Sequence, residues 1–385
     1  MKYIILNFSY GYGPFLRALE VAVALNNLRE QAGKERLPII MPWVYGNKQK
    51  EIIIQDFGRV LKNYPEEIFF DNKLGEYLKD IFYSNGDFWS YSESYLLKFW
   101  DIEQKVKDHF SKGFTVVSFD GNIERDIIKN DIVLEIARAP RLFFGINYSI
   151  YFSFGYLSDI FGVVMEDRHF YRYIDLISRL KSHFKNLEDK YNYHFIAYPG
   201  TMSGRKNYIP ARPTEILTPP HISDKKCHES VFDNRRAVYV NLSGIDKALL
   251  LDDFGGMCVC TNRPDKIKNA LGSPPSVLER DNFIGQIARS GWGAIWTSVV
   301  YEKPFFFFPY DFSDDPEIML NNKLISELGI GAPYNKTNLS DKNLMQNLQS
   351  NLKKLKIELM EKFGHIYGDQ YIAKYTYDKL SNINI

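Results

Sequence analysis

Apolar and glycine-rich segments alternate at the start of the chain in an order that predicts a strand, a helix and a second strand. Residues 2–8 form a short apolar run, and SYGYGP at 9–14 follows it as a tight turn. Residues 15–28 carry apolar side chains at helical spacing, and a further apolar run occupies residues 37–44. This order is typical of an α/β domain built on a parallel sheet.

The second half of the chain repeats the alternation. Apolar runs predict three strands and one short buried segment, at 237–242, 256–261, 305–309 and 283–288 respectively. A turn that contains Gly291 and Gly293 opens a helix after the buried segment, and Lys303 and Pro304 end that helix. The tail from residue 343 onward is mostly helical in pattern.

Composition shifts between the two halves. Residues 199–233 hold five prolines and many polar side chains, which predicts an interdomain linker or a long surface connection. Before this segment, the pattern also predicts strands at 115–119 and 194–198 and helices at 93–110 and 171–186. The predicted domains are 1–219, a linker at 220–235, a second domain at 236–361, and a C-terminal helix at 362–385.

Length and charge bound the class of protein. The chain has 385 residues, enough for two domains with separate cores. Its formal net charge of +1 gives no overall field that would draw it to nucleic acid. Its three cysteines are too few for a disulfide framework and form no CxxC pair for zinc. This usage indicates a reducing compartment, and we expect a cytoplasmic protein.

One uncharged segment bears on membrane association. Residues 142–158, LFFGINYSIYFSFGYLS, are shorter than the ~20 residues that a spanning helix needs. The segment also contains several amides and hydroxyls. We therefore predict a buried or interfacial aromatic segment and no transmembrane helix, and peripheral membrane contact stays open.

Residues 284–322, IGQIARSGWGAIWTSVVYEKPFFFFPYDFSDDPEIMLNN, carry the pattern that bears most directly on function. A glycine turn and a helix lead to a phenylalanine-rich strand and then to an acidic loop that ends in asparagines. This order resembles the donor half of GT-B-fold glycosyltransferases, the group of UDP-glycosyltransferases and MurG-like enzymes. Their pattern runs His-Gly-Gly-x-Gly-Thr, Glu-Ala, Gly-x-Pro, an apolar strand, Asp-Gln and Asn-Ala.

Several polar positions depart from the family pattern when the two are aligned on Gly291 and Gly293. The family's His, first Gly, Thr and ribose-binding Glu fall here on Arg289, Ser290, Ala294 and Thr297. The family's Gly-x-Pro becomes Glu302-Lys303-Pro304, and its Asp-Gln is sought among Asp314, Asp315, Pro316 and Glu317. The family's Asn matches Asn321. The order of elements is kept, so the resemblance supports the fold more than a particular substrate.

The resemblance implies an α/β protein with two Rossmann-like domains facing a cleft, and a last helix that crosses back onto the first domain. It also implies a nucleotide diphosphate sugar, with UDP as the default carrier, and neither a bound cofactor nor a metal. The implied donor-binding residues are Ser243, Gly244, Arg263, Ser276, Val277, Arg289, Ser290, Gly291, Trp292, Gly293, Asp314, Asp315, Glu317 and Asn321.

Each of these residue types suits one part of such a donor. Amides at a glycine turn and a helix N-terminus bind phosphate, and the Ser243-Gly244 turn after a strand adds short side chains beside it. Carboxylates accept hydrogen bonds from sugar hydroxyls. Arg263 is a possible bidentate donor to base or phosphate. The family holds the base by backbone groups at the place of Ser276 and Val277.

Catalysis has fewer candidates. Sugar transfer needs stabilisation of the departing diphosphate and often a base for the acceptor hydroxyl. Family members use a His in the first glycine-rich loop, where this chain has Tyr12 within the acceptor-side loop of Gly11, Gly13 and Pro14. A phenol is a poor base, so Asp120 is the alternative. It ends the strand predicted at 115–119, and we expect it at the carboxyl ends of the parallel strands, where substrates of open α/β sheets bind. His221 and His228, in the linker, are further candidates.

We therefore expect a glycosyltransferase, inverting rather than retaining because Arg289 and Thr297 replace the paired glutamates typical of retaining enzymes. The acceptor is a small molecule, a glycan or a lipid-linked compound. A UDP-sugar 2-epimerase and a non-catalytic sugar-nucleotide binder remain alternatives. A dinucleotide-dependent oxidoreductase is disfavoured, because the Gly11-x-Gly13 turn has Leu16 where the fingerprint needs a third glycine.

Overall fold

The computed structural model describes residues 1–82, 87–199, 210, 212–222, 235–242, 254 and 256–381. Two compact units contain them. Unit 1 comprises the described residues within Met1–Ala197, Ile209–His221 and Gly368–Ile385, and unit 2 those within Tyr198–Tyr208 and Ile222–Tyr367.

Unit 1 is built on a nine-stranded sheet with the order β5-β4-β3-β2-β1-β6-β7-β8-β9. Its strands are β1 (Tyr3–Phe8), β2 (Ile39–Pro42), β3 (Ile68–Asp71), β4 (Phe114–Ser118), β5 (Glu124–Ile127), β6 (Ile132–Arg138), β7 (Ser149–Ser153), β8 (Tyr193–Ala197) and β9 (Glu215–Thr218). All neighbours pair in parallel except β4, which is antiparallel to both β3 and β5. The carboxyl ends of β1–β3 and β6–β9 therefore share one edge of the sheet.

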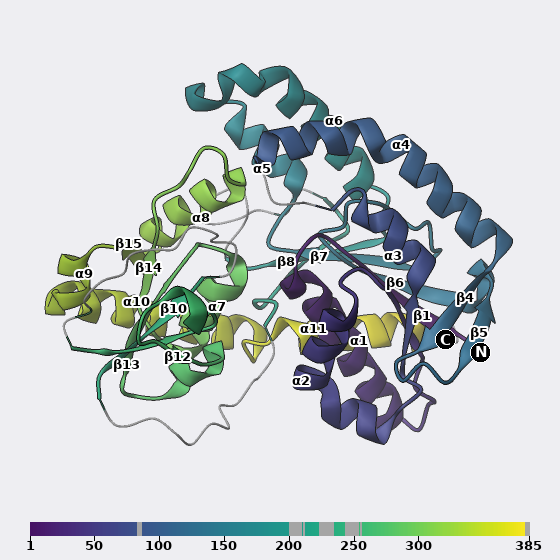
Figure 1. Cartoon of the computed structure of the whole chain (residues 1–385), viewed down its shortest axis with the longest axis horizontal. Coiled ribbons are helices and arrows are strands. Elements are labelled where there is room, and N and C mark those ends of the chain that lie inside the picture. Colours follow the sequence, from purple (N-terminus) through teal and green to yellow (C-terminus); the bar gives the residue numbers. More distant parts are fainter. Residues whose placement is uncertain are drawn as a thin grey trace. The chain divides into compact units, whose positions relative to one another are not determined.

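Helices cover both faces of this sheet (Figure 1). They are α1 (Tyr12–Gln31), α2 (Asn47–Asn63), α3 (Asn72–Lys79), α4 (Phe88–Lys112), α5 (Leu157–Val164), α6 (Ile174–Glu188) and α11 (Gly368–Ser381). Helices α1, α2 and α11 lie on one face and α4 and α6 on the other (Figure 1). With both faces covered, the central strands β1, β2 and β7 are buried along their whole length.

The uncharged segment 142–158 belongs to the core of unit 1. It contains the whole of β7, whose five residues are buried, and the side chains of Phe154 and Tyr156 are buried as well. The prediction of a buried aromatic segment is confirmed. No helix within the described ranges combines the length and apolar character needed to cross a membrane.

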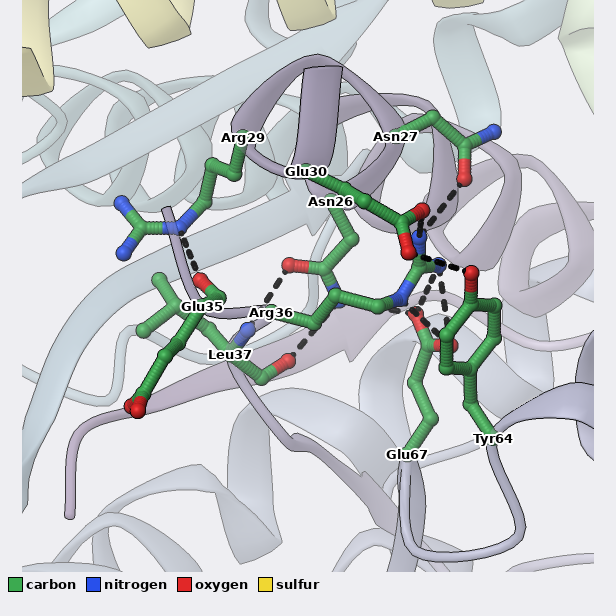
Figure 2. Close-up of polar contacts among 9 residues, drawn as sticks. All are labelled: Asn26, Asn27, Arg29, Glu30, Glu35, Arg36, Leu37, Tyr64 and Glu67. Carbon is green, nitrogen blue, oxygen red and sulfur yellow. Dashed lines mark hydrogen bonds and ion pairs between the residues drawn. The ribbon is translucent and has the colours of Figure 1, made fainter. Parts of the chain in front are cut away.

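A polar cluster fixes the amino ends of β2 and β3 against α1 (Figure 2). Arg36 donates from Nη2 to both carboxylate oxygens of Glu67, at 2.7 and 2.9 Å. Asn26 donates to Glu67 Oε1 at 2.8 Å and exchanges two hydrogen bonds with the backbone of Leu37. Since Glu67 is buried, the ion pair with Arg36 and the Asn26 amide offset the cost of removing its carboxylate from water. The cluster is at the edge opposite the carboxyl ends of the parallel strands.

The connection predicted at 199–233 contains a strand that its pattern did not reveal. β9 adds to the sheet beside β8, with His194 opposite Glu215. A segment of four residues flanked by prolines is too short for its apolar pattern to distinguish a strand from a loop. Pairing with β8 makes it a strand. The described residues of Ile209–His221 therefore belong to unit 1.

The last helix, α11, also belongs to unit 1. It packs beside α1, although the two are nearly the whole chain apart in sequence (Figure 1). Its start is fixed at Gly368, whose N–H donates to the carbonyl of Pro220 at 2.8 Å. A Cβ at Gly368 would lie 2.5 Å from the carbonyl oxygen of Pro219, so only glycine fits this close approach.

Unit 2 is built on an all-parallel sheet of order β12-β11-β10-β13-β14-β15. Its strands are β10 (Ala237–Asn241), β11 (Cys258–Thr261), β12 (Leu271–Gly272), β13 (Phe283–Ala288), β14 (Phe305–Phe307) and β15 (Gly331–Pro333). Its helices are α7 (Trp292–Tyr301), α8 (Pro316–Glu327), α9 (Lys336–Ser340) and α10 (Lys342–Phe363), with short 3₁₀ turns η3 (Pro264–Lys266) and η4 (Pro275–Glu279).

Two hydrophobic clusters hold the sheet of unit 2 between its helices. On one face, Val240, Ile287, Phe306 and Ala332 form a row across four strands and pack with side chains of α9 and α10. On the other face, Tyr239 packs among residues that include η4 side chains. Burial on both faces explains why these strands read as continuous apolar runs in the sequence.

Candidate functional site

The glycine turn lies at the carboxyl edge of the unit 2 sheet, where β13 passes into α7. Gly291 is the N-cap residue, with an extended backbone, and its carbonyl accepts hydrogen bonds from Ala294 and Ile295. The first turn of α7 contains no acidic side chain and receives no side-chain cap. A helix N-terminus of this kind attracts an anion through its amides and its dipole.

Two asparagines of α8 brace this turn. The side-chain amide of Asn321 donates to the carbonyl of Ser290 at 2.7 Å. The Ser290 hydroxyl donates to Asn322 Oδ1, and Asn322 donates in turn to the carbonyl of Phe308 at 3.2 Å. Asn321 and Ser290 are fully buried, so they hold the turn in place rather than offer themselves to a ligand.

Neither glycine of the turn is required by its packing against the residues that the structure describes. Gly291 has a φ of −76°, which any residue adopts. A Cβ built at Gly291 or at Gly293 meets nothing within 4 Å. Gly293 is also exposed and is the second residue of α7, where alanine is favoured over glycine by up to about 1 kcal/mol. Glycine at both positions leaves the first-turn amides of α7 open to the close approach of another group.

Arg289 and Asp314 form a bidentate ion pair beside the turn. Arg289 Nε donates to Asp314 Oδ2 at 2.7 Å, and Nη2 donates to Oδ1 at 2.5 Å. Arg289 follows β13, and Asp314 lies in the loop between β14 and α8. The predicted phosphate-side residue and one predicted sugar-side residue are therefore in direct contact.

The other two predicted acids also have roles within the loop. Asp315 is the N-cap of α8 and accepts from the N–H of Glu317 at 2.9 Å. Glu317 accepts from the Asn321 amide at 3.2 Å. Both side chains are partly exposed.

The aromatic residue of the turn is a packing residue. The side chain of Trp292 is buried and lies at 5.8 Å, nearly parallel, to the ring of Trp296 in the same helix. Thr297, in the place of the family's ribose-binding Glu, donates its hydroxyl to the carbonyl of Gly293 at 2.7 Å. The hydroxyl of Thr297 is therefore bonded to the backbone of its own helix.

The predicted base-side residues are more scattered. Arg263 is exposed after β11 and pairs with Asp265, with Nε and Nη2 each 3.0 Å from a carboxylate oxygen. Val277 lies in η4 with its side chain fully buried and its N–H bonded to the carbonyl of Pro274. Ser276 is half-buried beside it. Ser243 and Gly244 lie outside the described residues, as does His228.

The acceptor-side loop lies at the carboxyl edge of the unit 1 sheet, between β1 and α1. Gly11 is the N-cap of α1 with a φ of 107°, which requires glycine. Tyr12 is 45% exposed and packs edge-on to Tyr45 at 5.0 Å between ring centroids. Gly13 is exposed, Pro14 is half-buried, and a Cβ at Gly13 meets nothing within 4 Å. The loop thus resembles the α7 turn in having one glycine that the fold does not need.

The prediction that Asp120 lies at the carboxyl ends of the parallel strands is wrong. Because β4 is antiparallel to β3, with Ser118 opposite Phe69, its carboxyl end lies at the amino edge of the parallel strands. Asp120 there closes the β4–β5 hairpin and accepts from Ser118 and Asn122. These hydrogen bonds lower the pKa of Asp120 and make it a weaker base. Gly11 and Tyr12 lie at the other edge of the same sheet.

His221 is also unsuited to proton transfer. Its ring is buried and shares a 2.9 Å hydrogen bond with the Thr218 hydroxyl. Burial holds its pKa well below the ordinary histidine value, with Arg138 and Arg17 adding to the effect. A neutral histidine enclosed in this way packs against Phe152 and Phe154.

Sequence reasoning missed three residues of the site. Asn322 braces Ser290, Tyr45 holds the acceptor-side loop through a 2.6 Å hydrogen bond from the N–H of Gly11, and Asn262 Oδ1 accepts from the N–H of Leu242 at 2.8 Å. Asn322 could have been found as the second of two adjacent asparagines. Tyr45 and Asn262 follow strands at the carboxyl edges, which becomes visible only once the strands are ordered.

Among the residues that the structure describes, no group of three or more His, Cys, Asp or Glu side chains could hold a metal ion. The acids of the 311–317 loop point to separate partners.

The fold is shared with solved glycosyltransferase structures. A UDP-glucosyltransferase from Polygonum tinctorium, in a complex with 3,4-dichloroaniline, matches with a TM-score of 0.62 at 12% identity, over 98% of this chain and 98% of that one. UGT2 from Phytolacca americana, complexed with UDP-2-fluoro-glucose and pterostilbene, matches with 0.60 at 11%, over 99% and 100%. The glycosyltransferase SnogD from Streptomyces nogalater matches with 0.50 at 14%, over 99% of both chains.

No family model matches the sequence, and no curated protein matches it either. The likeness is therefore one of structure, across essentially the full length of each neighbour. It confirms the predicted α/β fold with two Rossmann-like halves, the GT-B architecture.

Proposed function

We propose that this protein transfers a sugar from a nucleoside diphosphate sugar to an acceptor hydroxyl. Unit 2 binds the donor, and the loop of Gly11–Pro14 in unit 1 contacts the acceptor. UDP is the carrier to test first, because UGT2 was solved with a UDP-sugar analogue. The donor is a co-substrate, and the proposal invokes no further cofactor. Cysteine usage favours the cytoplasm as its location.

The observation that carries the proposal is the unexplained glycine pair at the start of α7. The fold does not need Gly291 or Gly293, and glycine at 293 weakens its helix. A diphosphate lying against the first turn of α7 would explain both, because a side chain at either position would keep the phosphate oxygens from the amides. The position also suits a GT-B donor site, at the carboxyl edge of the second sheet.

In this assignment, the first-turn amides and the helix dipole stabilise the charge that develops on the departing diphosphate. Arg289 supplies a full positive charge next to them. Bond breaking at the sugar carbon leaves an electron pair on the diphosphate oxygen. The acceptor oxygen forms the new bond to that carbon, and its proton passes to solvent water. Attack on the face opposite the diphosphate gives inversion of configuration.

Small molecules are the acceptor class to test first. Two of the similar structures were solved with one, pterostilbene or 3,4-dichloroaniline. Tyr10 and Tyr12 are 40% and 45% exposed beside the acceptor-side loop, and aromatic faces of this kind bind planar or sugar-like partners. Glycans and lipid-linked acceptors are a second group.

A non-catalytic sugar-nucleotide binder is a second candidate, favoured by two observations. Thr297, in the family's ribose-binding position, bonds to its own helix. Asp120 lies at the amino edge of its sheet and is lost as a candidate base. Tyr12, whose phenol is a poor base, is then the candidate left among the described residues of the first loop. These changes affect sugar transfer more than diphosphate binding.

Thermal shift with UDP, dTDP, GDP and ADP, each alone and as its glucose conjugate, tests the donor site. At least one is expected to raise the Tm, and Gly291→Asp should abolish that shift by placing a negative charge against the phosphate. Gly58→Asp is the matched control, a helical glycine of α2 in unit 1. No shift with any of the eight compounds would end the proposal.

Turnover separates the two candidates. The enzyme should release free nucleoside diphosphate from the bound sugar conjugate when small phenolic acceptors are added, with the glycoside seen by mass spectrometry. Binding without release, over a broad acceptor panel, would favour the non-catalytic binder. Sugar isomerisation without an acceptor would instead indicate an epimerase.

A further inference from the structure

The ion pair between Arg289 and Asp314 joins two groups that the proposed function needs for different parts of the donor. Arg289 is beside the first turn of α7, where the diphosphate is placed, and Asp314 is in the loop placed next to the sugar. As long as the two are paired, Arg289 Nε and Nη2 and both carboxylate oxygens of Asp314 are engaged with each other rather than with a ligand.

The pair is accessible to a ligand. The Arg289 and Asp314 side chains keep 26% and 28% of their exposure, so solvent reaches both partners. Phosphate and carboxylate fit the same planar fork of an arginine. A diphosphate carries more negative charge than the one carboxylate that it would replace.

Backbone hydrogen bonds hold both partners independently of the pair. The N–H of Asp314 donates to the carbonyl of Asp311 at 2.8 Å, and its carbonyl accepts from the Tyr310 hydroxyl at 3.0 Å. The carbonyl of Arg289 accepts from the N–H of Gly291 at 2.7 Å. The main chain thus stays in place when the side chains change partner, and a guanidinium on a long side chain can turn at low cost.

The charges around the pair mean that Asp314, once released from Arg289, needs a new hydrogen-bond donor. Asp315 and Glu317 also act on Arg289, so the guanidinium is held in a negative field from three carboxylates. If Arg289 turned to a diphosphate and Asp314 gained nothing, that field would oppose binding. Sugar hydroxyls that donate to Asp314 compensate for the lost partner.

We propose, on the basis of the proposed function, that Arg289 exchanges Asp314 for the donor's diphosphate, and that the freed Asp314 carboxylate then accepts hydrogen bonds from hydroxyls of the attached sugar. The diphosphate alone breaks the pair without a replacement for Asp314. The complete sugar nucleotide breaks it and satisfies both partners. Arg289 and Asp314 together therefore make the site prefer a sugar nucleotide over the nucleotide product.

Calorimetry on the full chain tests the exchange with UDP and UDP-glucose, or with the dTDP, GDP or ADP pair if the thermal shifts select that base. The wild-type protein should bind the sugar conjugate more tightly than the diphosphate. Asp314→Asn is expected to strengthen diphosphate binding by about tenfold, because Arg289 is released, and to reduce the preference for the conjugate to near one. Arg289→Gln should weaken both ligands.

Asp314→Asn keeps the shape of the side chain and an oxygen for the N–H of Asp315, which now donates to Oδ1 at 2.7 Å. The variant should therefore fold, and its Tm without ligand checks this. Glu302→Gln is the matched control. It removes the Lys356–Glu302 pair of unit 2, whose side chains are 31% and 32% exposed, at the C-terminal end of α7.

The outcomes separate the exchange from the function on which it rests. Diphosphate binding that is unchanged or weaker in folded Asp314→Asn overturns the exchange and leaves a purely structural pair, with the donor site intact. A gain of the same size in Glu302→Gln overturns it too, as a general charge effect. Failure of every nucleoside diphosphate to bind the wild-type protein overturns the proposed function and the exchange together.

Discussion

The N–H of Gly11 donates to the hydroxyl of Tyr45 across 2.6 Å, so a residue that follows β2 fixes the loop that follows β1. Tyr45→Phe removes the acceptor and leaves a partly buried amide unsatisfied. We expect a loss of about 1 kcal/mol in stability and a looser acceptor-side loop. Transfer to the acceptor should fall through a raised KM for the acceptor, whereas donor affinity should be unchanged, as measured by steady-state kinetics and calorimetry.

The same variant discriminates between the two units. Tyr45 lies in unit 1, so a change in donor affinity in Tyr45→Phe would contradict the assignment of the donor to unit 2. Tyr64→Phe serves as a control, because this phenol donates to Glu30 within the cluster at the opposite edge of the same sheet (Figure 2). It should not alter the acceptor KM.

Gly293→Ala should make the protein more stable and a poorer binder. Alanine is favoured over glycine in a helix by roughly 0.5–1 kcal/mol, and its methyl group meets no protein atom within 4 Å. The same methyl group would lie between the α7 amides and a bound diphosphate. A higher Tm together with a weaker Kd for the nucleotide is the expected pair of results, from thermal unfolding and calorimetry.

Gly58→Ala provides the comparison, because Gly58 also lies within a helix and its added Cβ would make only an ordinary contact of 3.9 Å with Ile54. It should raise the Tm and leave the Kd as it was. If Gly293→Ala kept full affinity, nothing would approach the first turn of α7 closely, and the case for a diphosphate there would be lost.

Asp120→Asn is expected to leave turnover and both substrate affinities at their wild-type values. The residue closes a hairpin at the amino edge of the parallel strands, away from the Gly11 loop. Its hydrogen bonds to Ser118 and Asn122 stabilise that hairpin, so a small drop in Tm is the only effect anticipated. A large loss of kcat with an unchanged Tm would return Asp120 to the list of catalytic candidates.

Glu135 makes the stability of unit 1 depend on pH. Burial raises the pKa of this β6 carboxyl to about 7, although Asn7 and Tyr191 donate hydrogen bonds to it. The unfolded chain loses this proton near the ordinary value and the folded chain retains it, so the group destabilises the fold progressively from about pH 4.5 to 7. Below that range the penalty is absent, and above it the penalty is constant.

Glu135→Gln removes this titration while keeping the shape of the side chain. The free energy of unfolding of the variant relative to wild type should therefore rise between pH 5 and pH 8, by an amount on the order of 2 kcal/mol. The Tm of the variant relative to wild type should rise over the same range. Glu93→Gln, at an exposed position of α4, controls for the loss of a charge. If the variant and the wild type differed in stability by the same amount at pH 5 and pH 8, Glu135 would not contribute to the pH dependence of stability.

Much of the fold was predictable because long apolar runs and glycine turns report directly on parallel strands and the helices that follow them. β1, β10, β13 and β14 lie where the pattern places them, within a residue or two. The direction of a strand carries no such signal. The pattern at 115–119 is the same for a parallel and an antiparallel strand, and this ambiguity led to the wrong edge for Asp120.

The candidate site was predictable in its position along the chain and less so in its chemistry. The sequence places Arg289 and Asp314 twenty-five positions apart, and it cannot show that they pair, because that depends on β13 and β14 being neighbours. Nor can it show that Trp292 packs inward or that Thr297 bonds to its own helix. Such outcomes depend on side-chain directions that the fold sets as a whole.

Helix α11 imposes an order of events on biosynthesis. The side of α1 that it covers leaves the ribosome long before α11 is made. Nascent unit 1 must therefore keep an apolar surface open to chaperones until α11 emerges. A gene fragment that stops before Gly368 should yield aggregated protein, however carefully its boundary is chosen around the first sheet.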